Sequence, residues 1–133
     1  MKHLIFPFLI LWGVGMAGCD ETVQAQAGES FQINLGGHAE LAGSPLKLSF
    51  VKVTEDSRCP KGVHCIWAGQ VIAELHIEGK PALLTLPGGR DNAKAQTDSQ
   101  GFRIELQAVN PYPEEGMDMN KAAYQATLKI TRL

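Results

Sequence analysis

The segment Ile66–Glu78 reads IWAGQVIAELHIE and is the longest strand candidate in this 133-residue chain. Apolar and polar residues alternate along it with a period of two, as expected for a strand with one buried face. The apolar set consists of Trp67, Val71, Ala73, Leu75 and Ile77, and the polar set of Glu74, His76 and Glu78. The pattern predicts that Trp67 packs in the core, beside the nearby cysteines, and that His76 faces solvent.

The same alternation recurs on both sides of this segment, between turn signals rich in Gly, Pro and Asn. Its apolar positions are Phe31, Ile33 and Leu35; Leu46, Leu48 and Phe50; Ala82, Leu84 and Leu86; Phe102, Ile104, Leu106 and Ala108; and Tyr124, Ala126, Leu128 and Ile130. The phase slips at Phe50–Val51, which predicts a β-bulge. Residues 29–133 are therefore predicted to form an all-β domain, an antiparallel β-sandwich of about six to seven strands, with a small β-barrel as the alternative.

Residues 1–18 have the layout of a secretory signal peptide. A weakly positive head, Met1 to His3, precedes the uncharged run Leu4 to Val14 and then the small residues before Cys19. The apolar run is shorter than the roughly 20 residues that a membrane-spanning helix needs. We therefore expect a removable export signal.

Met16-Ala17-Gly18-Cys19 resembles the lipobox of bacterial lipoproteins, in which the cysteine receives a diacylglyceryl group and becomes the first residue of the mature protein. The resemblance implies a lipid-anchored protein of the bacterial cell envelope that faces the periplasm or the exterior. Residues 19–28 are then expected to form a flexible tether, whose last nine residues span at most about 30 Å. The alternative is cleavage after Ala27, at the Ala-x-Ala site Ala25-Gln26-Ala27, which would release a soluble secreted protein.

The chain contains three cysteines, and an exported protein with three leaves one unpaired. Lipidation of Cys19 would remove the odd thiol and leave Cys59 and Cys65 to each other. A disulfide is the leading interpretation of this pair in an oxidising compartment. A thiol oxidoreductase is disfavoured, because such enzymes usually place Cys-x-x-Cys at the start of a helix.

Residues 56–69 read DSRCPKGVHCIWAG. This stretch resembles the signature of a family of bacterial envelope lipoproteins, in which Asp-Ser-Arg-Cys-Pro and a short loop precede Cys-Ile/Val-Trp-Ala-Gly. The resemblance implies an exported, β-rich domain with one disulfide. It implies no activity.

A loop closed by a disulfide is suited to recognition, because its rigidity lowers the entropy lost on binding. The candidate binding residues are Arg58, Lys61, His64 and Trp67. Protease inhibitors present a basic residue on such loops, so Lys61 suggests an inhibitor-like alternative. The simpler alternative is that Lys61 and His64 are only solvated.

Metal binding is a second alternative. Imidazole and thioether groups suit copper or zinc, and the candidate ligands are His38, His64, His76, Met117 and Met119. These histidines are not clustered in the sequence, and we expect no bound cofactor.

Net charge and the spacing of carboxylates bear on three further kinds of function: nucleic-acid binding, membrane binding and catalysis. The chain has 12 basic and 14 acidic residues, and removal of residues 1–18 leaves 11 and 14, a net charge of about −3. This balance favours neither nucleic acid nor an anionic membrane surface as a partner. The adjacent carboxylates Glu55-Asp56 and Glu114-Glu115 point to opposite faces of a strand and make no acid/base pair. We expect a binding or structural module rather than an enzyme, with the membrane, through the lipid, and an envelope protein as partners.

Overall fold

The computed structural model describes residues 22–88 and 93–133. The expected signal peptide, Cys19 and the start of the expected tether lie outside these residues. In the described ranges, no helical segment has the length and apolar character needed to cross a membrane.

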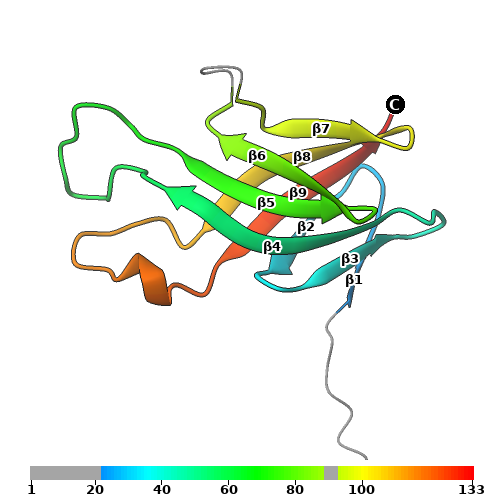
Figure 1. Ribbon diagram of the computed structural model, residues 1–133, viewed down its shortest axis with the longest axis horizontal. Coiled ribbons are helices and arrows are strands. Elements are labelled where there is room, and N and C mark those ends of the chain that lie inside the picture. Colours follow the sequence, from blue (N-terminus) through cyan, green and yellow to red (C-terminus); the bar gives the residue numbers. More distant parts are fainter. Residues whose placement is uncertain (1–21, 89–92) are drawn as a thin grey trace, which may run out of the picture.

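The described strands form two sheets that stack as a sandwich (Figure 1). Their bounds are β1 (Thr22–Ala25), β2 (Ser30–Asn34), β3 (His38–Leu41), β4 (Lys47–Asp56), β5 (Val71–Ile77), β6 (Lys80–Leu86), β7 (Gln96–Ser99), β8 (Phe102–Asn110) and β9 (Gln125–Arg132). One sheet has the order β1-β3-β4-β5-β6 and the other the order β2-β9-β8-β7. Only the β1–β3 pair is parallel among these strands. A short 3₁₀ helix, η1 (Met119–Lys121), interrupts the connection between β8 and β9.

The core lies between the two sheets and is built from the alternating apolar positions. Along β5, every second residue from Val71 to Ile77 is buried and the intervening ones are partly exposed. Phe50 and Leu75 from one sheet and Ile104 and Leu128 from the other are among the largest fully buried side chains. The predicted β-sandwich is therefore confirmed over the barrel, and the described residues form nine strands rather than six or seven.

The predicted β-bulge is confirmed in β4. Phe50 pairs with Leu75, while Lys52 rather than Val51 pairs with the next residue of β5. Val51 is the extra residue and its side chain is exposed. The bulge returns Val53 to the core side, where it pairs with Ala73. This restores the phase that strict alternation would have lost.

Strand β1 lies inside the segment that the sequence predicts to be a tether. It pairs with β3 over four residues, and the Ala42 N–H donates to the Ala25 carbonyl oxygen at 2.8 Å. Ala25 is only 1% exposed and Val23 packs against the core. The prediction of a flexible segment up to Gly28 is therefore wrong for residues 22–25, which belong to the folded domain.

Strand β5 begins at Val71 and not at Ile66. Gly69 has φ +71°, which ends the extended backbone on its N-terminal side. The parity counted from Trp67 does not carry across this break, and Trp67 is 47% exposed. The prediction that Trp67 lies in the core is wrong. His76 keeps its predicted outward direction and is half-buried.

Candidate binding site

A disulfide closes the connection between β4 and β5, which is named here the disulfide loop (residues 57–70). Cys59 and Cys65 are bonded, with their Cα atoms 5.9 Å apart, so the predicted pairing is confirmed. The two arms of the loop also pair through their backbones. The Ser57 N–H donates to Gln70 at 2.8 Å and the Cys59 N–H to Ala68 at 3.0 Å. The loop is thus closed by covalent and hydrogen bonds together.

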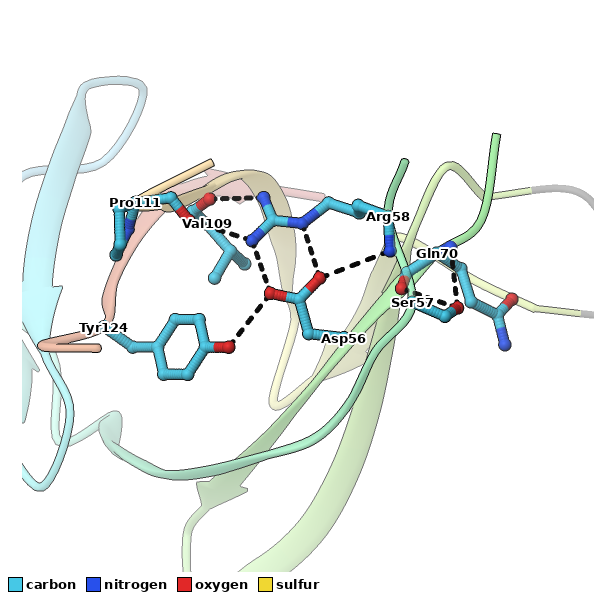
Figure 2. A network of polar contacts seen from close by, with 7 residues as sticks. All are labelled: Asp56, Ser57, Arg58, Gln70, Val109, Pro111 and Tyr124. Carbon is cyan, nitrogen blue, oxygen red and sulfur yellow. Dashed lines mark hydrogen bonds and ion pairs between the residues drawn. The ribbon is translucent and has the colours of Figure 1, made fainter. Parts of the chain in front are cut away.

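A buried ion pair holds the base of the disulfide loop (Figure 2). Arg58 donates from Nε to Asp56 Oδ1 and from Nη2 to Asp56 Oδ2, both at 2.8 Å. The side chains of Arg58 and Asp56 are only 9% and 5% exposed. The sequence indicates this local pair because Asp56 ends β4 and Arg58 follows it two residues later.

The same ion pair reaches the opposite sheet, which the sequence does not indicate. Arg58 donates from Nη1 to the Val109 carbonyl oxygen at 2.7 Å and from Nη2 to that of Pro111 at 3.0 Å. The hydroxyl of Tyr124 donates to Asp56 Oδ2 at 2.9 Å. The end of β4 is therefore fixed to the end of β8 and to the residue before β9, as Figure 2 shows.

The electrostatics of this network suit a structural role. Burial by itself raises the pKa of Asp56, but hydrogen bonds from Arg58 and Tyr124 and the charge of Arg58 together bring this pKa below its ordinary value. Burial, followed by the hydrogen bond to Asp56, raises the pKa of Tyr124 to about 12. At neutral pH the carboxylate is charged and the phenol keeps its proton. Neither group is poised for acid/base chemistry.

We expect the domain to lose stability in acid through Asp56. A carboxyl whose pKa is lowered in the folded state stabilises the fold above its unfolded value, 3.8 here. That stabilisation disappears as the pH falls through the lowered value, that is, below about pH 4. Denaturant titrations between pH 2.5 and 6 measure it. The change in the free energy of unfolding with pH across this window must be smaller in Asp56→Asn than in the unsubstituted domain. Equal changes would contradict the assignment.

A second loop, residues 111–124 between β8 and β9, lies beside the disulfide loop at the same end of the sandwich (Figure 1). The two are joined where the Lys61 N–H donates to the Pro113 carbonyl oxygen at 3.0 Å, and Lys61 and Glu114 form an isolated parallel bridge. Lys61 Nζ also lies 3.9 Å from Glu114 Oε1. The ring of Tyr112 lies below Arg58, with the guanidinium carbon 4.9 Å from the ring centroid. Charges on the two loops are thus largely compensated.

Three apolar side chains project from the far part of the disulfide loop, and we name them the apolar tip: Val63, Ile66 and Trp67. Ile66 has 107% relative exposure, so its side chain is entirely in solvent. Tyr112 and Met117, from the second loop, are also large apolar side chains with exposed surface. Single exposed apolar residues are common, but a group on two paired loops indicates a contact surface.

A groove of about 410 Å³ opens behind the apolar tip. Its walls come from both sheets and both loops, including Ala68, Val71, Leu86, Val109 and Tyr112. Arg58 also lines it, but the charge of Arg58 is balanced by Asp56. The groove therefore suits an uncharged, largely apolar group, and its volume lies in the range of small-molecule pockets.

The structure places the candidate binding residues in different surroundings. Lys61 and His64 are exposed on the disulfide loop, as predicted. Arg58 is buried in the ion pair with Asp56 and also lines the groove, so it belongs to the candidate site as part of a wall and not as an exposed charge. Ile66 was not among the candidates, although it is the most exposed apolar residue of the loop. Ile66 directly follows Cys65 in the loop. It was overlooked because the sequence pattern assigned it to a strand.

The predicted metal ligands do not form one cluster. His38 and His76 both flank Ser49 on the outer face of the larger sheet, since each pairs with it. His64 lies on the disulfide loop and Met117 and Met119 on the second loop. Within residues 22–88 and 93–133, no group of three or more His, Cys, Asp or Glu side chains is placed to hold a metal ion. Cys59 and Cys65 supply no thiolate while they are bonded to each other.

Reduction of the disulfide is expected to lower the free energy of unfolding by about 2 kcal/mol, because the closed loop is short. The paired backbones of the two arms remain, so the domain still folds. Urea titrations with and without reductant measure the difference. Cys59→Ser/Cys65→Ser must match the reduced protein and be insensitive to reductant. An effect near zero, or complete unfolding, would contradict this role for the bond.

Comparisons with protein-family models, with curated proteins and with solved structures find no match to this chain. The geometry of the two loops at one end of the sandwich is therefore what indicates a function.

Proposed function

We propose that this chain is a lipid-anchored protein of the bacterial cell envelope, and that its apolar tip binds another envelope protein. The observation that carries the proposal is Ile66, a fully exposed isoleucine on a loop fixed at its base. Burying such a side chain contributes about 1.5–3 kcal/mol. Within this domain Ile66 is not buried, so this stabilisation is gained only when a partner covers the side chain.

Rigidity favours the same proposal. The disulfide, the paired arms and the buried Asp56–Arg58 pair restrict the loop before any partner arrives. Less conformational entropy is then lost on association. Tryptophan is enriched among the residues that dominate binding energy, and Trp67 lies directly beside Ile66. The groove behind the tip can accept an apolar side chain of the partner.

Strand β1 supports the lipid anchor over release after Ala27. Cleavage at Ala27 would remove all of β1 and with it the buried Ala25 and the packed Val23. The edge of β3 would lose its partner, and the core beneath it would be exposed. A mature protein that begins at Cys19 keeps the whole strand.

Photo-crosslinking tests the binding role. A photoreactive phenylalanine analogue is placed at position 66 of the full chain, in the bacterium that makes it. We expect a discrete protein adduct whose yield falls at least about tenfold in Trp67→Ser, the loss of roughly 1.4 kcal/mol at a dominant contact. A thermal melt of each variant, compared with that of the unsubstituted chain, shows that the domain remains folded.

Leu83 on β6 provides the matched control, because it is a large apolar residue with 57% exposure on a strand away from the loops. The analogue at position 83 must not give the adduct. An adduct common to both positions, or none from position 66, would overturn the proposal.

A further inference from the structure

We infer that the partner of the apolar tip is held in or on the same membrane as the lipid anchor, and is not freely diffusing. This inference rests on the proposed function and names the kind of partner that it requires. Two observations carry it: the short chain between Cys19 and β1, and the small area of the tip.

The chain length keeps the domain close to the bilayer. Strand β1 begins at Thr22, only three residues after Cys19. Three residues span at most about 10 Å, in place of the roughly 30 Å that a tether up to Gly28 would allow. The folded edge of the larger sheet is thus held next to the membrane.

The sheet register bounds how far the tip can lie from the membrane. Thr22 is level with His38 on β3, which is level with Ser49 on β4. From Ser49, β4 continues for seven residues to Asp56, about 23 Å at the rise of a strand. Half of the disulfide loop adds at most about 25 Å. With the tether, the tip stays within roughly 60 Å of the bilayer in any orientation.

The area of the tip is small for a complex between freely diffusing proteins. A whole aromatic side chain buries about 150–250 Å², but Val63 and Trp67 are only 40% and 47% exposed, so the tip offers at most on the order of 400 Å² for burial. A stable interface of standard size buries about 800 Å² on each partner. Confinement to one membrane compensates, because it raises the effective concentration of the partner without any new contact.

Release of the domain from the membrane tests this inference. Residues 1–19 are replaced by a cleavable secretory signal, so that the mature chain begins at Asp20 and keeps β1. The photoreactive analogue stays at position 66, and the two proteins are compared at equal abundance. We expect the adduct to fall at least about tenfold in the released form. A second form, anchored through an unrelated membrane-spanning helix, must restore it.

The outcomes are distinct. Equal yields from anchored and released chains would overturn the inference while leaving the binding role intact. No adduct from the anchored chain would instead remove the proposed function itself. An adduct whose added mass is a phospholipid would overturn both, because the bilayer would then be what the tip contacts. A thermal melt of the released form, equal to that of the anchored form, shows that folding is unchanged.

Discussion

Gly69→Ala is expected to lower the free energy of unfolding by at least about 3 kcal/mol, one of the two largest effects in this domain. Gly69 has φ +71°, and a left-handed backbone costs an alanine about 1–2 kcal/mol. A Cβ atom at this position would also overlap the Ser57 carbonyl group and lie 2.8 Å from the Arg58 Cα atom. Because these are backbone atoms, the arms of the disulfide loop must separate and lose hydrogen bonds.

Gly62→Ala is the matched control for this substitution. Gly62 lies on the same loop with φ +82°, but a Cβ atom there would meet nothing within 4 Å. It carries only the backbone cost, about 1–2 kcal/mol. Chemical denaturation of both variants measures the difference. Equal losses would show that the close crossing of the two arms contributes nothing.

Arg58→Ala is the second large effect, and we expect a loss of about 3–5 kcal/mol. The substitution leaves the buried Asp56 carboxylate without its cation, with hydrogen bonds from the Tyr124 hydroxyl and the backbone N–H of residue 58. It also removes the donors to the carbonyl oxygens of Val109 on β8 and of Pro111 just after that strand. Leaving a buried charge without its partner is far more destabilising than losing an exposed pair.

Arg103→Ala is the control, because it removes an ion pair of similar geometry from an exposed position. Arg103 also donates from Nε and Nη2 to the two carboxylate oxygens of one aspartate, Asp98, at 2.8 and 3.1 Å. Those side chains are 42% and 47% exposed, so the loss should be far smaller than that of Arg58→Ala. Urea titrations of both variants provide the comparison. Similar losses would contradict the view that the Arg58 pair fixes the base of the loop through its burial.

The parts of the fold that follow from periodicity were predictable. Alternation locates the strands that supply most of the core, and the phase slip at Phe50–Val51 locates the bulge in β4. The strands that were missed, β1, β3 and β7, have only four residues each. Over four residues, alternation is too brief to separate a strand from a polar connection. The parallel pairing of β1 has no local signal at all.

At the candidate site, local pairs were predictable and distant ones were not. The cysteine count and spacing indicate the disulfide, and the neighbouring positions of Asp56 and Arg58 indicate their ion pair. Tyr124 joins that pair from 68 residues away, through the packing of the two sheets. Trp67 was misplaced because a backbone reversal at Gly69 breaks the parity on which its assignment depended. Reading parity through a glycine in a loop gives the wrong face.

The disulfide loop is the candidate functional surface of this domain. Its base is fixed by a disulfide and a buried ion pair, and its far part presents Ile66 and Trp67 to solvent. The anchor determines whether that surface works beside a membrane or in solution. The lipid anchor and the membrane-held partner therefore depend on where the mature chain begins.

Mass spectrometry of the mature N-terminus tests this central point most directly. The account predicts a chain that begins at Cys19, carries a diacylglyceryl group and retains Thr22–Ala25 as β1. An unmodified chain that begins at Gly28 would contradict it, because both the anchor and the first strand would be absent.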